Sequence, residues 1–231
     1  MNHFMNENEV IIQSYFEYLN NKSFPCVAAK AALAKEQIKC FVASHLMCPA
    51  DDRAILNFIY DFVDTYRNSE ELYHSAAVIF KGPVEINEDL FETLMWQRLQ
   101  SLADLDMARY PYDNRVNKSP ESKDFSFSLK QEAFFIIGLH PASARETRKF
   151  SHPALVFNPH SQFQKLKETS KYGHLQSVVR KRDIAFSGSI NPMLEDFGNA
   201  SEVFQYSGKI YDNKWKCPLR INHKDEHNTA A

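Results

Sequence analysis

Short apolar runs alternate along this chain with segments in which hydrophobic residues recur every three or four positions. The runs 134–139 (FFIIGL) and 154–157 (ALVF) have the length and the β-branched or aromatic content of buried strands. Residues 76–80 (AAVIF) predict a third strand of the same kind. The alternation of phenylalanine and serine before Leu129 predicts a half-exposed strand over 125–129.

Helical spacing and strong helix formers mark further segments. Residues 10–19 predict a short amphipathic helix, and 27–46 predict a longer one because alanine, lysine and leucine are frequent there. The apolar residues of 55–63 recur at helical spacing and are expected in the core, not in a cofactor site. Three more helices are predicted, over 87–102, 162–168 and 176–186.

The segment 187–219 has a different composition. It contains three of the six glycines together with five aromatic residues, so it cannot form one regular amphipathic element. Its aromatic side chains should nevertheless be buried, which predicts an ordered segment wrapped over the domain. The fold expected is therefore α+β: a single domain with a central β-sheet, flanking helices and this aromatic-rich C-terminal wrapping segment. The predicted boundaries are 1–22 for an N-terminal helix, 23–220 for the domain and 221–231 for a frayed tail.

Composition narrows the possible partners. The net charge of −2 over 231 residues gives no overall attraction to nucleic acid or to an anionic membrane. No apolar run approaches the ~20 residues of a membrane-spanning helix, and the N-terminus lacks the basic and apolar regions of a signal peptide. These features predict a cytoplasmic protein with neither a nucleic-acid nor a membrane partner.

Several standard signatures are missing from the sequence. GxGxxG, GxxxxGK[ST], HExxH and GxSxG do not occur, which argues against a classical dinucleotide fold, a P-loop enzyme, a zincin and an α/β-hydrolase. The cysteines form no CxxC pair, so neither a zinc ribbon nor a thioredoxin motif is indicated. In a reducing compartment all four are expected to be thiols: Cys26, Cys40, Cys48 and Cys217.

Two histidines occupy equivalent positions after the two most apolar runs. His140 follows 134–139 and His160 follows 154–157 almost directly, and each lies beside a proline. If these strands are neighbours, their ends are expected roughly 5 to 10 Å apart, and both imidazoles could line one pocket. The alternative is that each imidazole only caps a turn. Three cations lie between the histidines in sequence: Arg145, Arg148 and Lys149.

A haem site would account for this combination of residues. Haem needs an axial donor, an apolar slot and cations for its two propionates. His140 or His160 could be the donor, and the many phenylalanines could form the slot. Cys26 is an alternative donor because it is expected in the first turn of a helix, where the dipole lowers the pKa of a thiol. Plain core packing, with a structural cysteine, is the other interpretation. The propionates could bind Arg145, Arg148, Lys149 or Arg180.

A mononuclear metal site is a further possibility. It would combine His140 and His160 with a carboxylate such as Asp183 or Glu195, but no close ligand spacing supports it.

Six strings, in this order, closely resemble the YqcI/YcgG family: FPCVAAKAAL, GLHPASARETRKF, LVFNPHSQFQKL, GSINPMLEDFG, SEVFQYSGK and WKCPL. The resemblance covers residues 24–219. Members of that family include haem-dependent oxygenases that hydroxylate a guanidine nitrogen. The resemblance implies a haem b enzyme that hydroxylates a guanidine or amine substrate, arginine-like, using O2. Because no flavin or nicotinamide motif is visible, an external reductase is expected to supply the electrons.

Position by position, the resemblance implies roles for individual residues. His140 is expected to be the axial ligand, with His160 and Cys26 as alternatives, and Ala144 departs mildly from the small polar residue expected in its string. The residues implied to be catalytic are His140, His160 and Asp196. Those implied to bind the cofactor are Phe24, Cys26, His140, Arg145, Arg148, Asn158 and His160. The strings also hold Pro141, Pro159, Asn191 and Pro192. Carboxylates suited to clamp a guanidinium are Asp183, Glu195, Asp196 and Glu202.

Two other functions are compatible with the same residues. A non-catalytic haem-binding or sensor protein would use the same histidines and arginines without a substrate clamp, and guanidine-dependent consumption of O2 would separate it from an enzyme. A haem-free binding domain would stay colourless after reconstitution. A homodimer is also expected, because the aromatic tail offers more apolar surface than one domain needs.

Overall fold

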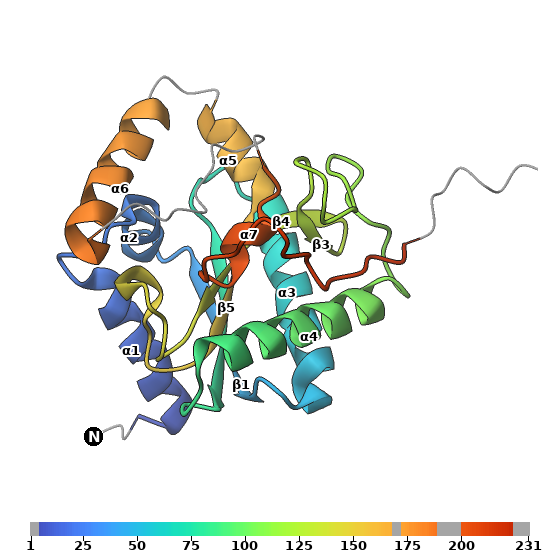
Figure 1. The fold of residues 1–231 in the computed structure, drawn as a ribbon, viewed down its shortest axis with the longest axis horizontal. Coiled ribbons are helices and arrows are strands. Elements are labelled where there is room, and N and C mark those ends of the chain that lie inside the picture. The colour runs from blue at the N-terminus through green and yellow to red at the C-terminus, as the bar shows by residue number, and fades with distance from the viewer. Residues whose placement is uncertain (1–4, 168–171, 189–199, 224–231) are drawn as a thin grey trace, which may run out of the picture.

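The computed structural model describes residues 5–167, 172–188 and 200–223, and these form a five-stranded sheet with helices on both faces (Figure 1). The strand order is β1-β2-β5-β4-β3; β1 and β2 are parallel, and every other neighbouring pair is antiparallel. This mixed sheet confirms the predicted α+β class. The strands are β1 (Ile38–His45), β2 (Ser75–Gly82), β3 (Phe127–Leu129), β4 (Glu132–Leu139) and β5 (Ala154–Pro159).

The strands predicted from apolar runs are confirmed. The first six residues of β2 are all buried, as expected for an apolar strand with a neighbour on each side and a helical layer over each face. β4 and β5 contain the predicted runs 134–139 and 154–157, and they pair with each other from Phe134↔Pro159 to Leu139↔Ala154. The core of the sheet therefore lies where the sequence is most apolar.

The second half of the predicted helix 27–46 is wrong. α2 (Val27–Ala34) ends early, and the chain turns at Glu36, whose φ is 57°. β1 then begins at Ile38 and pairs along its length with β2. Isoleucine, phenylalanine and valine in 38–42 favour a pleated, buried surface, and pairing with β2 outweighs the helix propensity of the flanking residues.

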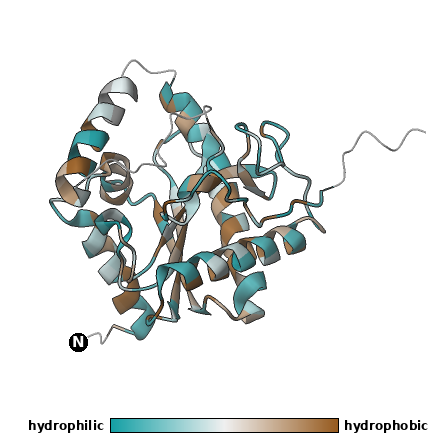
Figure 2. Cartoon of the chain, in the orientation of Figure 1, coloured by the Kyte–Doolittle hydropathy of each residue, from teal (hydrophilic) through white to brown (hydrophobic). Residues whose placement is uncertain are grey.

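Side-chain alternation divides the core into two apolar layers. Ala77, Ile79 and Val156 pack towards α1 (Glu7–Asn20) and α2, whereas Val78 and Phe157 pack towards the opposite helices. Those opposite helices are α3 (Asp52–Arg67) and α4 (Glu88–Asp106), as Figure 1 shows. In Figure 2 the strands are predominantly hydrophobic, whereas the helices around them carry both hydrophilic and hydrophobic residues. The remaining helices are α5 (His160–Lys167), α6 (Tyr172–Ser187) and α7 (Val203–Tyr206).

The C-terminal segment forms an aromatic cluster over α4, as predicted. Trp215 stacks on Tyr211 with ring centroids 3.9 Å apart and lies 6.0 Å from Trp96 of α4. Its indole N–H donates a 3.1 Å hydrogen bond to Glu92. Phe204 packs on the same indole at 5.2 Å. Of the five aromatic residues expected here, Phe197 lies outside the described residues.

No helix in the described part of the chain is long and apolar enough to cross a membrane.

Candidate functional site

His140 and His160 do not share a pocket. β4 and β5 are neighbours, as expected, but they are antiparallel, so their C-terminal ends lie at opposite ends of the pair. His140 follows the end where Leu139 pairs with Ala154, and His160 follows the end where Phe134 pairs with Pro159. The five register steps between these pairs, at about 3.4 Å each, separate the two ends by roughly 17 Å. The expected spacing of roughly 5 to 10 Å is therefore wrong.

His140 lies in apolar surroundings. Its side chain is 0% exposed and stacks on Phe91 of α4 with ring centroids 4.2 Å apart. Burial, followed by the charge of Arg148, lowers its pKa from 6.5 to about 4, so the imidazole is neutral. Neither ring nitrogen has a hydrogen-bond partner among the described residues. Gly138 leaves room for this stack, because a Cβ there would lie 2.9 Å from the Phe91 ring.

His160 lies in polar surroundings at the first residue of α5. Its Nδ1 is 3.2 Å from the Ser126 hydroxyl and 3.9 Å from Glu202 Oε2. Burial lowers its pKa to about 4 and raises that of Glu202 to about 8. Glu202 Oε1 accepts hydrogen bonds from Ser126 and Tyr206. At neutral pH this contact therefore joins a neutral imidazole and a protonated carboxyl group, not an ion pair.

A largely apolar cavity lies on the face of the sheet that α1 and α2 cover, and α6 also borders it. We call it the Cys26 cavity; its volume is about 270 Å³. Five of the seven predicted cofactor-binding residues line it: Phe24, Cys26, Arg145, Arg148 and Asn158. The predicted clamp residue Asp183 lines it too. The two histidines are not among its described lining residues. Its phenylalanine and tyrosine walls are Tyr15, Tyr18, Phe24, Tyr73, Phe135 and Phe163.

Cys26 caps α2 instead of lying in its first turn. Its Sγ accepts a hydrogen bond from the Ala29 N–H at 3.4 Å, and Pro25 precedes the helix. Burial raises the pKa of the thiol, and the hydrogen bonds from backbone N–H groups at the helix start only partly oppose this. The expected lowering of this pKa by the helix dipole is therefore wrong, because the loss of water around the sulfur has the larger effect.

The two arginines of the cavity are held differently. Arg148 is buried and donates to the carbonyl oxygens of Gly138 and Gln205 at 3.1 and 3.0 Å. Burial lowers its pKa to about 10, so it is charged at neutral pH. Arg145 donates to the Asp183 carboxylate at 2.7 Å, which ties the loop after β4 to α6. Positive charge thus borders an otherwise apolar space.

Asn158 is oriented by two strands. Its Oδ1 accepts a 3.0 Å hydrogen bond from Ser75 of β2, and its Nδ2 donates to Phe135 O of β4 at 3.3 Å. Sequence reasoning missed Ser75 and also His74, which lies just before the apolar run of β2. His74 lines the cavity, but its ring packs against Tyr66 at 5.5 Å and its Nε2 is 3.1 Å from the Ser69 hydroxyl.

Comparison with known proteins identifies the family. A sequence model of the YqcI/YcgG family matches residues 15–220, most of the chain. The chain belongs to the YqcI/YcgG family. It is 28% identical over 220 residues to the "Uncharacterized protein YqcI" of Bacillus subtilis (strain 168), covering 88% of this chain and 85% of that relative. No solved structure matched the chain. The resemblance seen in the six strings is thereby confirmed, and it gives the family without an activity.

The residues that surround the cavity of this YqcI/YcgG family member are of the types that bind haem. The walls are aromatic, Arg145 and Arg148 supply positive charge, and Cys26 offers a sulfur donor. Of the three predicted iron ligands, Cys26 lines the cavity, whereas His140 and His160 are not among its described lining residues. The predicted roles of His140 and His160 as iron ligands stay predictions. The volume of about 270 Å³ lies just below the roughly 300–1,000 Å³ of typical small-molecule sites.

Two other predicted features can be placed. No group of three or more potential metal ligands occurs among the described residues, so the mononuclear site with Asp183 has no structural support there. All four cysteines are free thiols, as expected. Four predicted site residues lie outside the described part of the chain: Asn191, Pro192, Glu195 and Asp196.

Proposed function

We propose that this protein is a haem-dependent oxygenase that hydroxylates a nitrogen of a guanidine or amine substrate, and that the Cys26 cavity is its active site. The observation that carries the proposal is the meeting of a thiol, two arginines and a carboxylate in one aromatic-walled cavity. Family resemblance supports the choice of chemistry. O2 and an external reductase are the other reactants that this proposal requires.

In this proposal each cavity residue has a defined task. Bound haem would supply the activation of O2. Cys26 Sγ would hold the haem iron, and because a coordinating thiol must lose its proton, binding would release that proton to solvent. Arg145 and Arg148 would hold the propionates. The aromatic walls would exclude water from the reacting nitrogen.

Asp183 is the described carboxylate best placed for a cationic substrate. It already binds the planar guanidinium of Arg145 at 2.7 Å, so its geometry suits a second guanidinium. A substrate that displaces this contact would free Arg145 for a carboxylate or propionate. Glu202, another predicted clamp, is buried and does not line the cavity; its Oε1 accepts hydrogen bonds from Ser126 and Tyr206.

Haem titration tests this proposal. The purified protein should develop a Soret band with hemin, and its reduced CO complex should absorb at the long wavelength typical of thiolate-ligated haem. Cys26→Ala should lose this band, whereas Cys48→Ala, which removes an exposed thiol, should keep it. A band that survives in Cys26→Ala but disappears in His140→Ala or His160→Ala would contradict the ligand assignment. Guanidine-dependent O2 consumption with an added reductase then tests catalysis.

The size of the cavity favours a second candidate. A volume of about 270 Å³ is close to the lower end of small-molecule sites, whereas haem would require the cavity to enlarge. The second candidate is therefore a haem-free domain that binds a small amphipathic ligand. Absence of any Soret band after reconstitution, together with binding of arginine by calorimetry, would favour it.

A further inference from the structure

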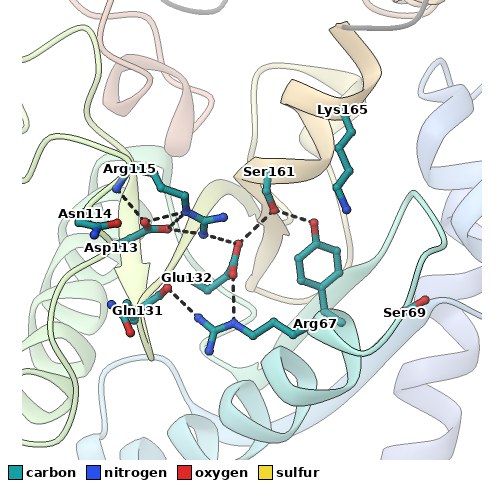
Figure 3. A pocket seen from close by; sticks show the side chains of 10 residues that line it. Arg67, Ser69, Asp113, Asn114, Arg115, Gln131, Glu132, Ser161 and Lys165 are labelled. Carbon is teal, nitrogen blue, oxygen red and sulfur yellow. Dashed lines mark hydrogen bonds and ion pairs between the residues drawn. The ribbon is translucent and has the colours of Figure 1, made fainter.

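A second, polar pocket lies near the end of the β4–β5 pair where His160 is found (Figure 3), and it shares no lining residue with the Cys26 cavity. We call it the Arg115 pocket; its volume is about 330 Å³. Three cations and two carboxylates line it, so it carries a net positive charge. These charged residues are Arg67, Lys165, Arg115, Asp113 and Glu132. The proposed oxygenase chemistry uses none of them.

Arg67 is held in place by a turn and a buried carboxylate. The β3–β4 hairpin turns at Lys130 and Gln131, which both have positive φ, 51° and 55°. Arg67 Nη2 donates to the carbonyl oxygens of both turn residues, at 3.0 and 2.7 Å. Its Nε donates to Glu132 at 3.4 Å. These contacts fix the guanidinium before any ligand arrives.

Arg115 is held by two buried carboxylates. Its Nε and Nη2 donate to Asp113, with the shortest contact at 2.6 Å, and Nη2 also reaches Glu132 Oε1 at 3.0 Å. Burial alone would raise the pKa of Asp113, but the hydrogen bonds and charge of Arg115 lower it. The Asp113 carboxylate is therefore ionised and keeps the arginine fork in one orientation.

The carboxylates have little capacity left for a further cation. Asp113 accepts from the side chain and the backbone of Arg115 and from the Ala133 N–H at 2.9 Å. Glu132 accepts from both arginines and from the Ser161 hydroxyl at 3.2 Å. Their negative charge thus orients the two guanidinium groups. A cationic ligand would have to displace a buried ion pair.

The cations, in contrast, keep unused donors. Arg67 and Arg115 both donate through Nε and Nη2, and the Nη1 group of each has no hydrogen-bond partner among the described residues. Lys165 is exposed, and its ammonium group likewise has no partner among the described residues. Figure 3 shows Lys165 extending from α5 towards the region that the two arginines border. Two oriented guanidinium groups and an exposed ammonium form a set suited to oxyanions.

We propose that the Arg115 pocket binds a small molecule through an oxyanion, either a carboxylate or a phosphate. Both groups present the planar or tetrahedral oxygens that paired guanidinium groups recognise. The open, polar site contrasts with the apolar Cys26 cavity, so the two sites would take ligands of different chemistry. The proposal is independent of haem.

Calorimetric titration at low ionic strength tests whether the Arg115 pocket binds an oxyanion, with inorganic phosphate and succinate as separate probes. At least one probe should bind with a dissociation constant in the millimolar range or tighter. The tighter probe identifies the group that the pocket recognises. Lys165→Ala should weaken that binding about fivefold, because one charge-assisted contact at a solvent-exposed site is lost. Lys165→Arg should restore most of it.

Lys165 is the best position for substitution because its side chain is exposed and makes no hydrogen bond or ion pair with the described residues, whereas Arg67 and Arg115 stabilise the hairpin. Lys214→Ala, which removes an exposed lysine of the C-terminal segment, should bind like the wild type. Absence of binding by either probe up to about 20 mM would overturn the proposal. Equal binding by wild type, Lys165→Ala and Lys214→Ala would overturn it as well.

Discussion

His140 and His160 each end a buried strand beside a proline, yet the fold surrounds them with opposite chemistry. His140 stacks on Phe91 and leaves both ring nitrogens without a partner among the described residues. His160 lies beside the Ser126 hydroxyl and the protonated Glu202. Burial lowers the pKa of each to about 4, so both are neutral at pH 7. The same protonation state therefore arises in an apolar stack and in a polar network.

Similar position along two strands therefore does not imply similar position in space. In an antiparallel pair the C-terminal ends of the two strands lie at opposite ends of the pair. The residue that follows each strand is therefore surrounded by different elements. Four substitutions measure how far the two surroundings differ.

The largest effect is expected from Arg148→Met, next to His140. This change leaves the carbonyls of Gly138 and Gln205 without their donor, and should lower the free energy of unfolding by about 3–5 kcal/mol in urea denaturation. Lys149→Met, at an exposed neighbour, should cost less than about 0.5 kcal/mol. A cost for Arg148→Met below about 1 kcal/mol would mean that relief of charge burial offsets the lost hydrogen bonds.

Glu202→Gln should change how stability depends on pH near His160. Because the folded-state pKa of Glu202 is raised from 4.5 to about 8, the folded protein keeps a proton that the unfolded chain loses in this range. Wild-type stability should therefore fall as pH rises from 5 to 8, by about 2–4 kcal/mol relative to Glu202→Gln. Urea denaturation at both pH values measures the difference, and Glu146→Gln at an exposed site is the control. If the difference in stability between wild type and Glu202→Gln is the same at pH 5 and pH 8, Glu202 is ionised in the folded protein.

His160→Phe should lower the free energy of unfolding by about 1–3 kcal/mol, because the Ser126 hydroxyl loses a buried partner. Combining it with Ser126→Ala in a double-mutant cycle isolates the contribution of this contact. Fully additive effects would mean that the two side chains do not interact.

His140→Phe should have the smallest effect, less than about 1 kcal/mol at pH 7, because no recorded hydrogen bond is lost and the ring still stacks on Phe91. At pH 5 the variant should be more stable than the wild type. The unfolded wild type gains a proton at His140 below pH 6.5, whereas the folded protein does not until about pH 4. A large loss of stability at pH 7 would reveal a polar partner of His140.

Much of the fold could be predicted from the sequence because no polar residue interrupts its apolar runs. Residues 76–80, 134–139 and 154–157 all lie in buried strands, and a run of that length has few other places in a domain. The strand over 38–45 was missed because alanines and lysines precede it without a turn signal. This segment forms a strand because it pairs with β2, and local propensity does not report pairing between segments distant in the sequence.

The composition of the Cys26 cavity was largely predictable, whereas its geometry was not. Phe24, Cys26, Arg145, Arg148 and Asn158 were expected together and do line one space. The connection over 140–153 contains prolines and no helical periodicity, which already favoured an antiparallel pair and hence separated histidines. No local pattern indicated the Arg115 pocket, because its charges come from four segments far apart in the chain.

The position of β5 between β2 and β4 has a consequence for synthesis. The edge of β2 that pairs with β5 stays open until residue 159 has left the ribosome, since β5 ends there. Until then the nascent chain displays an apolar strand with one open edge, a template for association with other chains. We therefore expect nascent chains that stop before residue 154 to recruit holding chaperones, and chains released after residue 159 to escape them.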